Sequence, residues 1–220
     1  MRLTVPRLFQ LVAMATALAL AGCSTQPRLP AVPRHETAEA SFLGIPDARF
    51  SLTGDPAPLA AMYAAAERRR QMAGATGTEH LLAISGGGED GAFGAGLLYG
   101  WTERGDRPQF RLVTGVSTGA LTAPFAFLGS RYDPQLKTVY TTVQRDNIAQ
   151  LLPILTILNG DSVADSRPLA GLIATHITPE VVEEIGREYQ KGRLLLIGTT
   201  NPDPGQPTPW NTGAIAASHH

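Results

Sequence analysis

The 220-residue sequence lacks several features, and each absence excludes a class of protein. Cys23 is the only cysteine, which excludes a disulfide framework, a thiolate metal cluster and a Cys-x-x-Cys redox site. Lysine occurs only as Lys137 and Lys191, so a lysine-centred phosphate loop is not expected. The formal net charge of −1 lacks the basic excess of nucleic-acid-binding domains, and nucleic acid is therefore not an expected partner. The hydrophobic fraction of 43% suits a globular domain with a buried core.

Residues 1–22 have the pattern of a secretory signal peptide. Arg2 and Arg7 precede an apolar run that is shorter than the about 20 residues of a membrane-spanning helix. The run ends in Leu20-Ala21-Gly22-Cys23, which resembles the lipobox of bacterial lipoproteins. We therefore expect a lipid anchor on Cys23 that attaches the protein to a membrane of the bacterial cell envelope. An ordinary signal peptide with a chance cysteine is the alternative.

Composition divides the rest of the chain into a linker, a helical lead-in and a domain. Ser24 stands where an aspartate often favours inner-membrane retention in similar lipoproteins, so the outer membrane is the expected location. Prolines at every third position, 27, 30 and 33, predict an extended linker over residues 23–54. Residues 55–79 are the predicted helical lead-in, and residues 80–220 the predicted domain.

From residue 81 onward, short strands alternate with helices. The expected strands are 81–85, 110–114 and 193–198, and the expected helices are 55–72, 90–103, 117–128, 133–144, 166–176 and 179–190. The strands are continuous apolar runs, which is typical of strands that are buried on both faces. This alternation predicts an α/β fold in which helices cover a mainly parallel sheet.

A G-x-S-x-G motif, Gly115-Val116-Ser117-Thr118-Gly119, lies between a predicted strand and a predicted helix. In a nucleophile elbow the turn is so tight that the flanking residues must be small, and the serine projects clear of the backbone. The helix N-terminus adds backbone N–H groups and a partial positive charge beneath the reacting centre. Ser117 is therefore the candidate nucleophile, with Gly115 and Gly119 as the small residues of the elbow.

Consecutive glycines, Gly86, Gly87 and Gly88, follow the preceding strand. Their amides can point at one spot without interfering side chains, as an oxyanion hole requires. The same stretch matches G-x-G-x-x-G, but no carboxylate ends the second strand, as a dinucleotide site would need. Successive parallel strands bring both turns to the same edge of the sheet, which favours the oxyanion hole.

Taken together, Ser-Gly-Gly-Gly-x-x-Gly and the later Gly-Val-Ser-Thr-Gly resemble the patatin-like phospholipases, over residues 81–217. This resemblance implies a three-layer α/β fold and a Ser–Asp dyad that hydrolyses acyl esters of phospholipids or other lipids. It also implies that Ser117 is the nucleophile and that Gly86, Gly87 and Gly88 form the oxyanion hole. No cofactor and no metal are expected. The chain departs from many members at Asp90, where they carry an arginine.

The catalytic aspartate of the family is not found by pattern. It belongs to an Asp-Gly-Gly or Asp-Gly-Ala motif that follows the strand matching residues 194–199, whereas the only Asp-Gly-Ala here starts at Asp90. The aspartates after Ser117, at positions 133, 146, 161, 165 and 203, lack a following glycine. We therefore expect the domain to be incomplete at its C-terminus and the chain to be a poor esterase.

Three alternatives stay open. An α/β-hydrolase triad would use Asp161 or Asp165 with His176, which follow Ser117 in the required order. A non-catalytic envelope lipoprotein could keep the fold without the chemistry. The apolar stretch over residues 147–159 belongs either to the core or to a flap over the acyl-binding groove.

Overall fold

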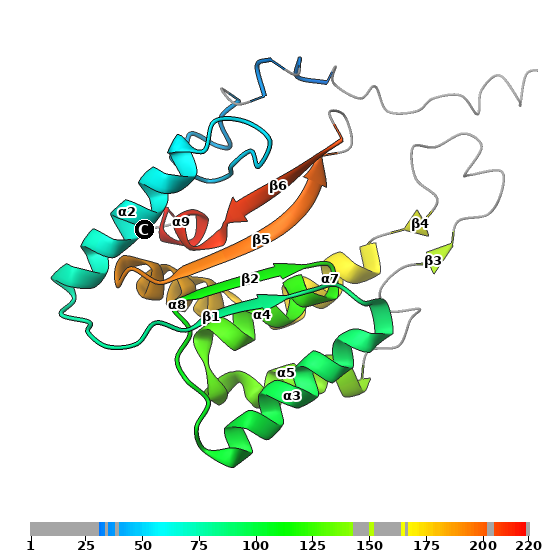
Figure 1. The fold of residues 1–220 in the computed structure, drawn as a ribbon. Helices are drawn as coiled ribbons and strands as arrows, with labels where there is room; N and C mark the ends of the chain where they lie inside the picture. The colour runs from blue at the N-terminus through cyan, green and yellow to red at the C-terminus, as the bar shows by residue number, and fades with distance from the viewer. Residues whose placement is uncertain are drawn as a thin grey trace, which may run out of the picture.

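The computed structural model describes residues 31–33, 35–37, 40–142, 150–151, 164–165, 167–201 and 205–218. Its main sheet has the strand order β1-β2-β5-β6 (Figure 1). The strands are β1 (Leu81–Ile84), β2 (Leu112–Val116), β5 (Leu194–Asn201) and β6 (Gln206–Asn211). The first three are parallel, and β6 pairs antiparallel with β5. A separate pair is formed by β3 (Gln150–Leu151) and β4 (Ala164–Asp165). The predicted α/β class with a mainly parallel sheet is confirmed.

Helices cover both faces of this sheet and complete the three layers. They are α2 (Ala57–Met72), α3 (Gly91–Arg104), α4 (Thr118–Leu128), α5 (Asp133–Thr142), α7 (Arg167–His176), α8 (Pro179–Gln190) and α9 (Thr212–Ala217). Two short 3₁₀ turns, η1 (Gly88–Asp90) and η2 (Ser130–Tyr132), precede α3 and α5. Helix α4 continues through Pro124 and is buried over most of its length.

Alternate residues of the strands pack into two separate clusters, because successive side chains point to opposite faces of a sheet. Val113 and Leu195 are fully buried in a cluster that includes α3, α4, α5 and α8. Leu112, Leu194 and Leu196 face the other way and pack with side chains of α2. The strand–helix alternation seen in the sequence therefore produces a sheet with α4 directly beneath its centre (Figure 1).

The segment before α2 covers the outer edge of β6. Phe50 N donates to Pro209 O at 3.0 Å, and Asn211 N donates to Ala48 O at 2.9 Å. Ala48 and Phe50 are buried, with 3% and 6% of their surface exposed. These residues fall in the range where the sequence predicted an extended linker, and the structure instead places them against the domain.

A buried ion pair joins the segment between α3 and β2 to the start of α5. Arg107 Nη1 lies 2.7 Å from Asp133 Oδ1, and the two side chains are only 4% and 5% exposed. Nearby, Arg193 precedes β5 and donates from Nε to Phe110 O at 2.9 Å. Burial lowers the pKa of Arg193, and its hydrogen bond to Glu188 opposes that effect. Both arginines lie at the amino-terminal end of the parallel strands.

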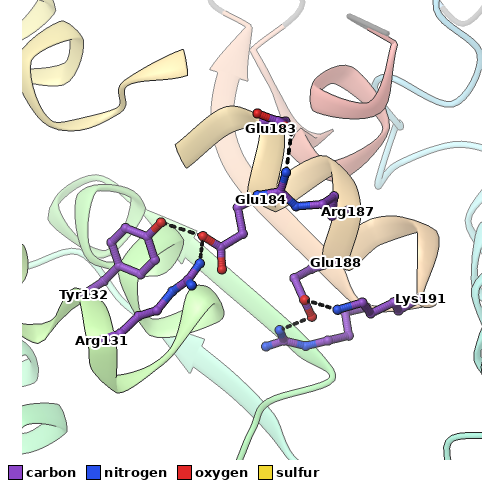
Figure 2. A network of polar contacts seen from close by, with 8 residues as sticks. Arg131, Tyr132, Glu183, Glu184, Arg187, Glu188 and Lys191 are labelled. Carbon is purple, nitrogen blue, oxygen red and sulfur yellow. Dashed lines mark hydrogen bonds and ion pairs between the residues drawn. The ribbon is translucent and has the colours of Figure 1, made fainter. Parts of the chain in front are cut away.

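Figure 2 shows how α8 is fixed at the same end of the sheet. Tyr132 donates to Glu184 Oε2 at 2.6 Å, and Arg131 forms an ion pair with the same carboxylate. One turn further along α8, Glu188 accepts from Lys191 at 2.6 Å and also binds Arg193 at 2.8 Å. Glu184 thus attaches α8 to η2, and Glu188 attaches it to the residue that precedes β5.

Several residues singled out in the sequence lie outside the described part of the structure. They are the signal peptide with Cys23, most of the apolar segment 147–159, and Asp146, Asp161 and Asp203. Among the helices that the structure describes, none combines the length and the apolar character of a transmembrane span.

Candidate active site

The glycine-rich turn and the candidate nucleophile meet at one edge of the sheet. Strands β1 and β2 are parallel neighbours, with Ile84 opposite Gly115, so the turns that follow them emerge side by side. A Cβ atom at position 86 would lie 2.8 Å from Ser117 Cβ and 3.5 Å from Ser117 Oγ. Only glycine fits there, and the backbone of the turn therefore lies directly against Ser117.

Ser117 adopts the strained backbone that a sharp strand-to-helix turn imposes. Its φ of 52° and ψ of −124° lie where side chains are disfavoured. A Cβ at position 115 would lie 2.3 Å from Gly119 O, and one at position 119 would lie 2.3 Å from Ile84 O. Close backbone contacts thus require the two glycines, and the tight strand-to-helix turn that the sequence predicted is present.

The turn after β1 leaves backbone donors available near Ser117. No described residue accepts a hydrogen bond from the amides of Gly86 and Gly87. The turn is closed by a hydrogen bond from Asp90 N to Gly87 O at 3.0 Å, and Gly88 has a positive φ of 56°. Free amides at the end of a strand, beside a serine at a helix N-terminus, can stabilise a negative oxygen.

Tyr140, which the sequence did not indicate as a site residue, forms hydrogen bonds with the first turns of α4. The Tyr140 hydroxyl donates to Thr118 O at 2.9 Å and lies 2.8 Å from Thr122 Oγ1. Burial raises the pKa of this tyrosine, so the hydroxyl keeps its proton. A Cβ on Gly91 would lie 3.1 Å from the same hydroxyl, so Tyr140 stands between the two turns of the site. No local sequence pattern announces such a contact between helices.

The candidate bases are distributed unevenly. Asp133 is occupied by Arg107 in the buried pair at the opposite end of the sheet. His176 lies at the end of α7, and no hydrogen bond between it and Ser117 exists within the described residues. Asp165 is in β4, and Asp161 lies outside the described residues. Asp90 ends η1, which follows the first two glycines of the turn, and it is exposed, as are Glu89 and Ser117.

No metal-binding cluster is present in the part of the chain that the structure describes: no three His, Cys, Asp or Glu side chains are grouped to hold an ion. At the site itself, the structure brings together a hydroxyl, backbone amides and a helix N-terminus. Such a set serves acyl transfer, in which an alcohol attacks a carbonyl and the carbonyl oxygen becomes negative.

Comparison with known families agrees with this geometry. A family model described as patatin-like phospholipase matches residues 82–215, which is more than half of the chain. The matched range contains both turns of the site and all four strands of the main sheet except the first residue of β1. No curated protein and no solved structure matches the chain.

Proposed function

Because the chain belongs to the patatin-like phospholipase family, we propose that it hydrolyses acyl esters of lipids with Ser117 as its nucleophile. Family membership supports the general class, a lipid acyl hydrolase acting on phospholipids or related esters. The observation that carries the finer assignment is the close approach of Gly86 to Ser117, at the edge where both turns emerge. A purely structural turn would not require an unpaired glycine backbone beside an exposed serine.

In the proposed reaction, Ser117 Oγ attacks the ester carbonyl carbon and gives up its proton to a carboxylate base. The carbonyl oxygen becomes an oxyanion that accepts hydrogen bonds from the amides of Gly86, Gly87 and Gly88. Collapse of this intermediate breaks the bond to the alcohol, which takes the proton from the base. Water then attacks the acyl-serine and releases the fatty acid, which regenerates the Ser117 hydroxyl.

The base that we propose is an aspartate, as the resemblance to the family implies. None of the aspartates whose side chains the structure describes forms a hydrogen bond with Ser117. Asp161 and Asp165 are the first to replace if residues 23–220 hydrolyse esters. Loss of turnover in either variant, with the fold retained, would identify the proton acceptor.

We further propose that Cys23 carries a lipid that anchors the protein to the cell envelope, with the outer membrane as the expected location. Its support is the lipobox pattern around the only cysteine of the chain. Cys23→Ala should release the protein from the membrane fraction or stall its processing. A wild-type protein that fractionates as soluble and lacks the acyl mass would contradict the anchor.

Labelling with a fluorophosphonate probe tests the nucleophile directly. We expect wild-type protein to react at Ser117, and Ser117→Ala to lose both labelling and ester hydrolysis. Ser130→Ala is the matched control, because Ser130 lies in η2, away from the two turns of the site. Labelling that persists in Ser117→Ala would refute the assignment. A folded wild-type protein that neither labels nor hydrolyses any ester would fit a non-catalytic lipoprotein, or a chain in which Ser117 has no base.

A further inference from the structure

An apolar cavity of about 370 Å³ lies alongside the helix that carries Ser117. Its walls come from α4, α5, α7, α8, α9 and β5, which are far apart in sequence. Among the described residues that line it, only His176 and Thr212 are polar, and none is a carboxylate, an arginine or a lysine. A cavity at the lower end of the usual volume for ligand sites, with this lining, suits one slender apolar group.

The cavity follows the face of α4 on which Ser117 stands. Its α4 wall consists of Ala120, Leu121, Pro124 and Phe125. These positions are three, four, seven and eight residues after Ser117, and such spacings place residues on one side of a helix. The wall therefore runs from the first turn after the nucleophile toward the interior of the domain.

The strand beside the elbow supplies the opposite wall at the same level. Ile197 of β5 lines the cavity and is paired in register with Gly115, two residues before Ser117. On the outer side, Leu172 and Ile173 of α7 complete the enclosure. Helix α7 buries none of its residues, and Ile173 is 41% exposed. The wall that α7 supplies is thus partly exposed to solvent, whereas α4 is buried over most of its length.

We propose that this cavity binds the acyl chain of the ester that Ser117 cleaves, an inference that rests on the proposed function. An ester carbonyl held at Ser117 between the glycine amides can extend its hydrocarbon chain along α4, while the polar alcohol part stays at the exposed edge. The helix rises about 1.5 Å per residue, so the distance along α4 from Ser117 to Phe125, at the far end of the cavity wall, is about 12 Å. Three backbone bonds of an extended chain span about 3.6 Å, so about ten bonds of an acyl chain fit this length.

Binding of fatty acids to the Cys23→Ala protein, which lacks the proposed anchor, tests the cavity without detergent. The fluorescent probe 11-dansylamino-undecanoic acid is bound first, and its displacement by saturated fatty acids of about four to sixteen carbons gives their affinities. We expect affinity to rise about fourfold for each added methylene up to about ten carbons, and then to level off. Affinity that does not depend on chain length, or that keeps rising to the longest acid, would overturn the proposal.

Two substitutions by tryptophan separate the cavity from general surface hydrophobicity. Ile173→Trp fills the cavity from its outer wall and should weaken binding of the ten-carbon acid at least tenfold, with the break moved to shorter chains. Leu97→Trp, at a 59% exposed position of α3 outside the cavity, is the matched control and should bind like the parent. Thermal unfolding checks that both variants fold. Equal effects of the two substitutions would contradict the assigned site.

The outcomes also separate this inference from the proposed function. Ser117→Ala should lose hydrolysis and keep the chain-length profile of binding, because Ser117 does not line the cavity. Ester hydrolysis that Ile173→Trp leaves unchanged for all chain lengths would refute the cavity while Ser117 remains the nucleophile. Binding with the expected profile, in a protein that the fluorophosphonate does not label, would refute the nucleophile and leave the binding site.

Discussion

At the amino-terminal end of the parallel strands the elements are joined by charged side chains, whereas at the carboxyl end they are joined by glycine. Arg107, Asp133 and Arg193 are buried or nearly buried at the first end, and each has a partner of opposite charge. At the second end, Gly86, Gly115 and Gly119 bring backbones within contact of one another. Substitutions that remove a charge break the contacts at the first end. At the second end, substitutions that add a side chain force the backbones apart.

This difference assigns separate tasks to the two ends. Long side chains can bridge elements, but they would fill the space in which a substrate carbonyl has to sit. Glycines leave that space open, and in the proposed mechanism their amides face it, while Ser117 is held in a strained backbone. We therefore expect changes at the charged end to affect stability, and changes at the glycine end to affect chemistry.

The largest effect is expected for Asp133→Ala. This change leaves the buried guanidinium of Arg107 without its carboxylate, which typically costs about 3–5 kcal/mol. Urea unfolding measured by circular dichroism should show the loss. The double variant Arg107→Met, Asp133→Leu should recover much of it, because no uncompensated charge remains. A single variant as stable as the wild type would mean that solvent reaches this pair.

Gly86→Ala should act at the other end. The new methyl group would meet Ser117 Cβ at 2.8 Å, so either the turn or the nucleophile has to move. We expect a cost of about 1–3 kcal/mol from overpacking and a fall in the rate of fluorophosphonate labelling. Gly100→Ala is the control, since nothing lies within 4 Å of its added Cβ and alanine favours a helix. Equal labelling rates in both variants would contradict the predicted contact.

Two tyrosine variants compare the ends directly. Tyr140→Phe removes the hydroxyl that binds Thr118 O, next to the nucleophile, and should lower stability by about 1 kcal/mol together with the labelling rate. Tyr132→Phe removes the hydrogen bond to Glu184 and should lower stability by a similar amount without slowing the labelling. If both variants label at the wild-type rate, Tyr140 does not help to position Ser117.

The smallest expected effect is on pH dependence at the charged end. Burial favours the neutral form of Glu188, but hydrogen bonds from Lys191 and Arg193 outweigh it and lower the pKa below the ordinary value of 4.5. A lowered carboxyl pKa contributes stability above pH 4.5 that is lost as the pH falls through the lowered value. The difference in melting temperature between wild type and Glu188→Gln should therefore shrink below pH 4.5. A constant difference across that range would contradict the assigned charge.

The sequence predicted the elements that depend on local pattern. Strands expected at 81–85 and 193–198 are found at 81–84 and 194–201, and the helices agree within a few residues. The strand expected at 110–114 lies at 112–116 instead, because Gly115 and Val116 pair with β5. An apolar run does not reveal such a partner. The glycines of both turns were predictable because close backbone contact and sharp turns leave little choice of residue.

Features that depend on distant partners were not predictable. Strand β6 contains Pro207 and Pro209, which argue against a strand, and it is tolerated because it lies beyond β5 at the side of the sheet. The contact of Tyr140 with Thr118 and the pairing of Arg107 with Asp133 both join residues more than 20 positions apart. Periodicity and propensity carry no information about such pairs, so only the folded chain reveals them.

The positive φ of Ser117 makes the stability of this protein compete with its proposed activity at a single residue. Glycine adopts that backbone without strain, so Ser117→Gly should gain about 1 kcal/mol of stability while losing the hydroxyl. Directed evolution that rewards only resistance to heat would then favour an inert protein. A thermostability screen of this chain therefore has to measure ester cleavage in the same round. Otherwise it selects variants in which Ser117, the proposed nucleophile, has been replaced.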